Sequence, residues 1–206
     1  MKYLPEKQQF SGKGGKKIKQ VYLNLENHGT IKAIGQELPE VDLVHIAEAR
    51  IRFSQQQDET VYTLTVKSSG GEVRDEFETE ISQERFEELL QFGSEGEINK
   101  ERFECLLSES LVAEVDVYGG KLEGLVTAEI EYDQDEIPSP EVESLLASLL
   151  GEGKVVSEYQ CFKNKNLAKA ESLEEVQENY LHEKTAESEE LSEVGFKSQV
   201  KKIALT

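Results

Sequence analysis

The sequence predicts a mainly β protein of the α+β class, in which antiparallel strands form the core and helices pack on one of their faces. Seven segments alternate between apolar and polar residues with a period of two, which is the pattern of a strand whose two faces differ. Glycine pairs at Gly70–Gly71 and Gly119–Gly120 indicate tight turns between neighbouring segments. Two amphipathic stretches interrupt the series, and each has an apolar stripe that needs a surface to cover.

Each predicted strand separates polar from mainly apolar side chains. In the second segment, for example, Glu48, Arg50 and Arg52 alternate with apolar residues. Side chains two positions apart on a strand point to the same face, so every segment predicts one polar and one mainly apolar face, and the polar face carries charge in every segment after the first. In chain order the segments are 18–25, 48–53, 61–67, 74–81, 100–105, 114–118 and 127–132.

Helix signals follow the fourth and the seventh of these segments. Ser82 is a predicted N-cap ahead of a stripe of Phe and Leu residues. Ser139 is a second predicted N-cap, with Pro140 at the first helical position, where the missing N–H has no partner to lose. We expect both helices to cover the apolar faces of the strands.

The remaining segments carry weaker signals. We expect residues 26–47 to form a long connection that holds only a short helix around 41–47. Ser172 and Glu175 fit a capping box and predict a helix near the end of the chain. From Thr185 onward the sequence is polar and rich in Glu and Ser, and we expect it to be mobile.

Composition narrows the classes of function. The net charge of −19 disfavours nucleic acid as a partner, because nucleic acid binding requires basic surfaces. No apolar run reaches the ~18 residues of a membrane span and no secretion signal is recognisable, so we expect a cytoplasmic protein with no membrane partner. Cys105 and Cys161 have no metal-like spacing and are expected to be free thiols. Three scattered histidines do not suggest a zinc site or a histidine-based triad.

The charged faces carry both signs of charge, which permits two interpretations. An open, half-exposed sheet would leave the charges in solvent. A closed barrel would bring them to one lumen, where a polyphosphate and a divalent metal would satisfy cations and acids together. Periodicity alone leaves both interpretations open. The side chains concerned are Arg50, Arg52, Lys67, Arg74, Lys100 and Arg102 against Glu76, Glu78, Glu114, Asp116, Glu129 and Glu131.

Short motifs follow one another in a defined order between residues 17 and 168. They are Arg50-Ile-Arg52, Leu64-Thr-Val-Lys67, Arg74-x-Glu76-x-Glu78, Lys100-x-Arg102, Glu114-Val-Asp116, Gly124-Leu-Val-x-Ala-Glu129-Ile-Glu131 and Phe162-x-Asn164-x-x-Leu167-Ala168. In residue type, spacing and order, this series resembles the motifs of the CYTH family, also called triphosphate tunnel metalloenzymes.

The resemblance implies an eight-stranded closed antiparallel barrel, the triphosphate tunnel, with helices packed outside it. The tunnel domain would cover residues 1–168, with a first strand that is truncated or degenerate. An acidic, helical or mobile tail would cover residues 169–206.

The resemblance also implies a function, namely metal-dependent binding and hydrolysis of an inorganic or organic triphosphate inside the tunnel. The cofactor would be Mg²⁺ or Mn²⁺, and the partner a small-molecule triphosphate. Two alternatives stay open. One is a catalytically impaired tunnel that binds polyphosphate or a nucleotide without turning it over, and the other is a class IV-type adenylate cyclase.

Residue by residue, the resemblance assigns a binding role to the cations and a metal-binding role to acids, and it assigns no catalytic residue. Glu129, Glu131 and Asp116 are expected to hold the metal. Glu76 and Glu78 are expected to pair with arginines. The expected substrate-binding residues are Lys2, Arg50, Arg52, Lys67, Arg74, Lys100 and Arg102.

The chain departs from the family at its first strand, where the family carries Glu-x-Glu-x-Lys. The run Met1-Lys2-Tyr3-Leu4 resembles the end of that motif, so Lys2 matches its lysine while both glutamates would precede residue 1. Two carboxylates placed two residues apart on a strand can share one cation. Without this pair we expect weaker metal binding and no carboxylate to orient the attacking water.

A Glu-x-Glu segment added ahead of Met1 should therefore raise turnover far more than affinity. Phosphate oxygens complete the shell of Mg²⁺ in either protein, whereas a small misplacement of the attacking water costs about 100-fold in rate. The measurement compares the turnover and the dissociation constant of inorganic triphosphate for the two chains. Equal turnover would show that the added glutamates do not matter, or that a residue such as Glu6 replaces them.

Overall fold

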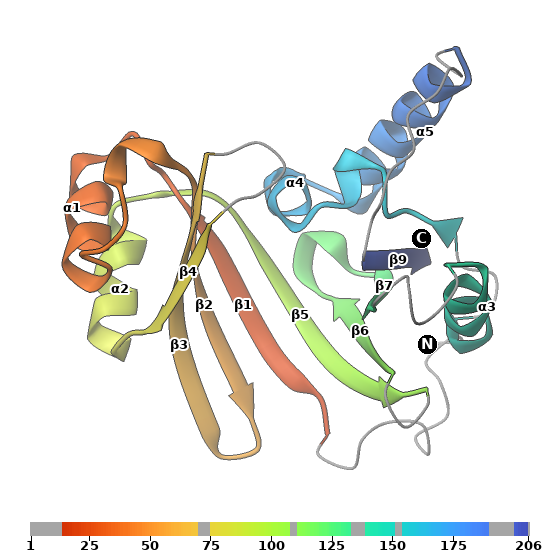
Figure 1. Ribbon diagram of the computed structural model, residues 1–206, viewed down its shortest axis with the longest axis horizontal. Helices are drawn as coiled ribbons and strands as arrows, with labels where there is room; N and C mark the ends of the chain where they lie inside the picture. The colour runs from red at the N-terminus through yellow and green to blue at the C-terminus, as the bar shows by residue number, and fades with distance from the viewer. Residues whose placement is uncertain are drawn as a thin grey trace. The chain divides into compact units, whose positions relative to one another are not determined.

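A computed structural model of the protein describes residues 14–69, 75–107, 111–132, 139–150, 154–189 and 200–205 (Figure 1). The chain forms two compact units. The N-terminal unit is Lys17–Asn99. The C-terminal unit runs from Lys100 to the end of the chain and includes the residues up to Lys16.

The N-terminal unit is built on an antiparallel sheet with the strand order β4-β3-β2-β1. The first part of β5 continues this order beside β1, where Lys19 Nζ lies 3.1 Å from Glu97 Oε2 and the Asn24 N–H donates to the carbonyl of Gly93 (3.4 Å). The strands are β1 Lys16–Leu23, β2 Ile46–Gln56, β3 Glu59–Ser68, β4 Glu76–Glu80 and β5 Ser94–Leu106.

Two helices, α1 (His28–Glu37) and α2 (Gln83–Gln91), cover the apolar face of this sheet. Their side chains join those of the strands in one core, in which Ile34, Leu64 and Leu89 are fully buried. The sequence predicted α2 and its N-cap, and the Ser82 hydroxyl accepts a hydrogen bond from the N–H of Arg85 (3.2 Å).

Helix α1 was not predicted, and the expectation of a long connection over 26–47 is corrected. Asn27 is the N-cap, since its side chain accepts a hydrogen bond from the N–H of Gly29 (2.7 Å). Gly29 and Gly35 are poor helix formers, which weakened the local signal. Burial of Ala33 and Ile34 against the sheet compensates for that weakness. The short helix expected around 41–47 is a 3-10 turn, η2 (Leu43–His45).

The C-terminal unit holds the second part of β5 and a sheet in the order β5-β6-β7-β9-β8. Helix α3 contacts β7 and β9, and its buried Val142 and Leu149 belong to the core of this unit. The elements are β6 Val112–Tyr118, η3 Gly120–Leu122, β7 Val126–Glu131, α3 Ser139–Leu150, β8 Lys154–Val155 and β9 Val200–Leu205.

Strand β9 lies in the stretch that the sequence led us to expect to be mobile. Its residues 200–205 pair antiparallel with all of β7, from Val126 opposite Leu205 to Glu131 opposite Val200. The short strand β8 then pairs with its other edge. Strand β9 therefore covers the edge of β7, which would otherwise expose unpaired backbone groups.

Near the C-terminus, η4 (Gln160–Phe162), α4 (Asn164–Lys169) and α5 (Leu173–Glu189) pack together. The predicted helix is α5, and the Ser172 hydroxyl accepts a hydrogen bond from the N–H of Glu175 (3.3 Å) as a capping box requires. Tyr180 on α5 packs its ring against those of Tyr159 and Phe162. Among the described residues, no helix is long and apolar enough to cross a membrane.

The mainly β, α+β class predicted from the sequence is confirmed, and all seven predicted strands correspond to strands β1–β7. A closed eight-stranded barrel is not observed. The hydrogen-bonding order of the described strands runs from β4 to β8, and no pairing between described residues joins these two ends. Both end strands are short, with five residues in β4 and two in β8, so neither offers a long edge for closure.

Replacing a fully buried strand residue should destabilise the N-terminal unit strongly. Leu64 lies at the centre of β3 with 0% of its surface exposed, so Leu64→Ala removes buried methylenes and leaves a cavity. We expect a loss of about 2–5 kcal/mol in the free energy of unfolding, measured by urea denaturation. Val44 is 84% exposed, and the matched variant Val44→Ala should change stability by less than about 0.5 kcal/mol. Equal losses for the two variants would contradict the assignment of this core.

Candidate functional site

The strand register of the N-terminal unit brings three predicted cations to one face of its sheet. Arg50 and Arg52 on β2 lie opposite Tyr22 and Gln20 on β1. We call this surface the cationic face. Its rows across the sheet are Tyr22-Arg50-Thr65-Glu78, Gln20-Arg52-Thr63-Glu80 and Glu48-Lys67-Glu76.

Arg50 and Lys67 share one carboxylate on the cationic face. Arg50 Nη2 donates to Glu76 Oε1 (3.3 Å), and Lys67 Nζ lies 2.9 Å from Glu76 Oε2. The Glu76 side chain is 45% exposed, whereas that of Arg50 is only 14% exposed. Solvent screens an exposed acid, so Glu76 offsets the two cations only in part.

Two buried donors on the cationic face have no hydrogen-bond partner among the described residues. They are Nε of Arg50 and the hydroxyl of Thr63. Thr63 lies in register with Arg52, one row away from Arg50. A buried donor without an acceptor costs free energy, and it is rare in native proteins unless a ligand, ion or water supplies the acceptor. This part of the face can therefore accept an anion at little cost.

Neutral side chains on β1 also contact the two arginines. Gln20 Oε1 accepts a hydrogen bond from Arg52 Nη2 (3.4 Å), and Gln20 Nε2 donates to Tyr22 Oη (2.8 Å). Arg50 hydrogen-bonds the same hydroxyl. Burial and the charge of Glu48 raise the pKa of Tyr22 to about 12 despite Arg50, so the hydroxyl keeps its proton at neutral pH.

The C-terminal unit gathers charges of both signs on one face, which we call the mixed face. Arg102 on β5 lies opposite Asp116 on β6, and Glu114 on β6 lies opposite Glu129 on β7. Lys202 on β9 occupies the register position opposite Glu129. The sequence prediction did not include Lys202 because it did not predict β9.

Asp116 is buried between two cations on the mixed face. Its Oδ2 accepts hydrogen bonds from Lys100 Nζ (2.6 Å) and Arg102 Nη2 (2.8 Å), and its Oδ1 accepts one from Arg102 Nε (2.7 Å). Arg102 Nη1 donates to Glu114. Only 2% of the Lys100 and Asp116 side chains is exposed, so these ion pairs are formed away from water.

The cations determine the protonation state of Asp116. Burial alone would raise the pKa of the carboxyl group, but Lys100 and Arg102 outweigh it and lower the pKa to about 2. Burial acts to lower the pKa of Arg102, and the facing carboxylates raise it above its ordinary value. Asp116 is therefore an anion at every pH above about 3, and it holds Arg102 through a two-pronged contact.

The acids expected to bind a metal are only partly assembled. Glu129 and Glu131 lie two residues apart on β7 and share the mixed face, but Glu131 is exposed, and Asp116 is engaged by Lys100 and Arg102. Within the described ranges, no three His, Cys, Asp or Glu side chains form a group that could hold a metal. Glu114 and Glu129, directly opposite each other, are the closest acids in register. A divalent metal held by Glu129 and Glu131 would need phosphate and water oxygens to complete its shell.

The structure distributes the predicted site residues between the two units. Arg50, Arg52 and Lys67 come together in the N-terminal unit. Lys100, Arg102, Asp116, Glu129 and Glu131 come together in the C-terminal unit. Lys2 and Arg74 lie outside the described residues.

Sequence analysis did not predict roles for Gln20, Tyr22 and Thr63 on the cationic face. The alternation in β1 and β3 placed these residues opposite the apolar face. It did not show that they lie beside arginines, because that depends on the pairing register.

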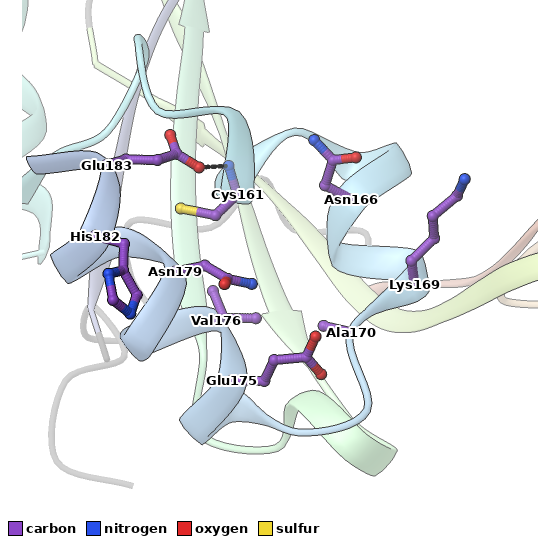
Figure 2. A pocket seen from close by; sticks show the side chains of 9 residues that line it. All are labelled: Cys161, Asn166, Lys169, Ala170, Glu175, Val176, Asn179, His182 and Glu183. Carbon is purple, nitrogen blue, oxygen red and sulfur yellow. Dashed lines mark hydrogen bonds between the residues drawn. The ribbon is translucent and has the colours of Figure 1, made fainter. Parts of the chain in front are cut away.

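A separate pocket of about 330 Å³ lies in the C-terminal unit between α4 and α5 (Figure 2). Its lining includes Cys161 and Glu183 and none of the predicted site residues. Burial, with Glu183 nearby, raises the pKa of the Cys161 thiol to about 12, which makes it a poor nucleophile. Glu183 itself accepts hydrogen bonds from the backbone N–H groups of Gln160 (2.6 Å) and Cys161 (2.8 Å). We assign these contacts to the packing of η4 on α5.

Comparisons with known proteins give similarities of structure alone. No protein family matches the chain, and no curated protein matches it. A solved structure named the inorganic triphosphatase NE1496 has 23% sequence identity and a TM-score of 0.48, covering 82% of this chain and 93% of that chain. Another, named the hypothetical protein NE1496, has 22% identity and a TM-score of 0.49, covering 82% and 95%. Protein PH1819 from Pyrococcus horikoshii OT3 has 20% identity and a TM-score of 0.44, covering 69% and 80%.

At these identities and TM-scores the similarity is one of structure and fixes no activity.

Removing the charge of Asp116 should destabilise the C-terminal unit in a pH-dependent way. Asp116→Asn leaves Lys100 and Arg102 buried without their common partner, a change that typically costs about 3–5 kcal/mol. The pKa of Asp116 falls from 3.8 to about 2 on folding. This shift stabilises the folded state by about 2 kcal/mol above pH 4, and the stabilisation is lost as the pH falls toward 2.

The measurement is urea denaturation of the original protein and of Asp116→Asn between pH 7 and pH 2. The gap in stability between the two should be constant down to about pH 4 and should narrow below it. Asp75 is exposed, so the control variant Asp75→Asn should differ little from the original protein in its free energy of unfolding at every pH. A gap for Asp116→Asn that is independent of pH would contradict the ion pairs described here.

Proposed function

We propose that this chain binds a small molecule bearing a triphosphate and hydrolyses it with the help of a divalent metal. The observation that supports this most strongly is the cationic face, where the buried Arg50 Nε and the Thr63 hydroxyl find no acceptor within the described part of the chain. Phosphate oxygens are strong acceptors, and a polyphosphate offers several in a row. The motif series that resembles the triphosphate tunnel enzymes gives the same ligand class.

In this proposal each cation of the N-terminal unit has its own role in binding. Arg50 and Arg52 present planar guanidinium groups, which match pairs of phosphate oxygens, and Lys67 acts as a point charge. The phosphate replaces Glu76 as the main partner of Arg50 and Lys67, and this exchange is easy because Glu76 is 45% exposed and can turn to water. Lys2 and Arg74 belong to the same proposed set.

In the C-terminal unit we propose residues that bind the divalent metal. Glu129 and Glu131 bind Mg²⁺ or Mn²⁺ together with phosphate and water, while Asp116 fixes Lys100 and Arg102 in place. The metal, when bound, neutralises phosphate charge and lowers the pKa of a coordinated water.

A second candidate function is binding of a triphosphate without turnover. It is favoured by the state of Asp116, whose two oxygens already accept three hydrogen bonds from Lys100 and Arg102 and so are not available to activate water. Positioning and charge neutralisation provide most of the catalysis of phosphoryl transfer, so binding alone retains many of the same contacts.

Replacing Arg52 should weaken triphosphate binding while leaving the fold intact. Arg52→Ala removes a charged donor of the cationic face, and we expect a loss of about 1.5–3 kcal/mol in binding free energy. Arg52→Lys keeps the positive charge but loses the planar guanidinium group, so its affinity should lie between those of the original protein and Arg52→Ala. Titration calorimetry with inorganic triphosphate, with and without Mg²⁺, measures all three proteins. Lys32 is exposed on α1, and Lys32→Ala is the control for loss of one positive charge.

The two candidate functions differ in product formation. Release of inorganic phosphate from triphosphate in the presence of Mg²⁺ or Mn²⁺, and its loss with a chelator, supports the hydrolase. Binding without phosphate release supports the second candidate. Absence of binding at millimolar triphosphate, with and without metal, would rule out both.

A further inference from the structure

Two neutral residues of β1 contact the arginines of the cationic face, and nothing in the proposed function uses them. Gln20 is 1% exposed and Tyr22 is 2% exposed. They lie directly opposite Arg52 and Arg50 in the register of β1 and β2. Burying an amide and a phenol at these positions costs free energy unless their polar atoms are hydrogen-bonded. The hydrogen bonds of Gln20 and Tyr22 should therefore show why polar residues are buried here.

The polar atoms of Gln20 link one arginine to the hydroxyl that contacts the other. Its Oε1 accepts from Arg52 Nη2 (3.4 Å), and its Nε2 donates to Tyr22 Oη (2.8 Å). Arg50 hydrogen-bonds the same hydroxyl. The order of contacts is therefore Arg52, Gln20, Tyr22, Arg50, and it runs across two adjacent strands whose backbones are fixed by their pairing.

Neutral partners affect a guanidinium differently from acidic ones. Asp116 holds Arg102 by a two-pronged ion pair, which fixes its orientation but also offsets its charge. Gln20 and Tyr22 carry no charge at neutral pH, so they orient a guanidinium without themselves offsetting its charge. A long flexible side chain that is already ordered also loses less freedom when the anion binds.

We propose that Gln20 and Tyr22 are positioning residues, which fix the guanidinium groups of Arg50 and Arg52 in the orientation that receives a polyphosphate. The identity of the anion rests on the proposed function. The positioning itself rests on the contacts within the N-terminal unit.

The test uses two variants of the full chain, Gln20→Leu and Tyr22→Phe. Each removes hydrogen bonds and nearly preserves side-chain volume, and thermal melting checks that each is folded. Titration calorimetry with inorganic triphosphate should show binding weakened about five- to tenfold for each variant. Thr30 is also a fully buried polar residue of this unit, on α1 in its helical layer, so Thr30→Val is the matched control and should bind as the original protein does.

A double-variant measurement separates positioning from a general loss of stability. If Gln20 acts through Arg52, then Gln20→Leu should have little further effect on affinity in an Arg52→Ala background. Independent, additive losses, or an unchanged affinity for both single variants when the original protein binds triphosphate, would overturn the proposal and leave the proposed function standing.

A second measurement needs no ligand. Hydrogen bonds slow the rotation of a guanidinium group, and side-chain ¹⁵N NMR detects this as separate Nη signals. We expect faster rotation of Arg52 in Gln20→Leu and of Arg50 in Tyr22→Phe, with no change in Thr30→Val. If the original protein binds no triphosphate, the proposed function fails, and these spectra still decide on positioning. Arginine signals that are identical in all proteins would overturn it.

Discussion

Burial of charge is the constraint that both charged faces have to satisfy. Every strand with one apolar face must place its other residues together, and here those residues include arginines and lysines that are largely withdrawn from water. The mixed face meets the constraint with opposite charges, through Asp116 between Lys100 and Arg102. The cationic face meets it mainly with neutral groups and with Glu76 at its exposed edge. One face is therefore close to neutral within its core, and the other surrounds its two arginines with neutral groups and places its acids on the neighbouring positions of the sheet.

This difference gives the two faces different chemistry. The ion pairs of the mixed face are rigid and resist exchange of their partners, because breaking one of them leaves a buried charge without a counter-ion. A face held by amide and hydroxyl groups keeps its attraction for anions from solution. In the net acidic chain, with a charge of −19, arginines held among neutral groups are a means by which an anion can be attracted.

The strands could be predicted from the sequence because alternation is a local property, and β1–β7 all follow it. Helix α1 and strand β9 could not. Gly29 and Gly35 weaken the helical signal of α1, and its stability comes from Ala33 and Ile34 against the sheet. The residues of β9 are ordered by pairing with β7, a partner far away in the chain, which no local pattern reveals.

The sequence predicts which residues belong to the candidate site better than it predicts which of them contact each other. Alternation places Arg50 and Arg52 on one face, and the expected pairing of Glu76 with an arginine is observed. Glu78 instead accepts a hydrogen bond from Thr65 (2.7 Å), and Asp116 is held by cations, because register and burial decide which neighbours meet.

The pairing of β7 with β9 also sets an order of events during synthesis. Strand β7 leaves the ribosome well before β9, since α3, α4 and α5 lie between them in the chain. Until residues 200–205 have emerged, one edge of β7 has no partner and can pair with strands of other chains. Folding of the C-terminal unit is therefore completed late, and a chain truncated within α5 would have an open, aggregation-prone edge at β7.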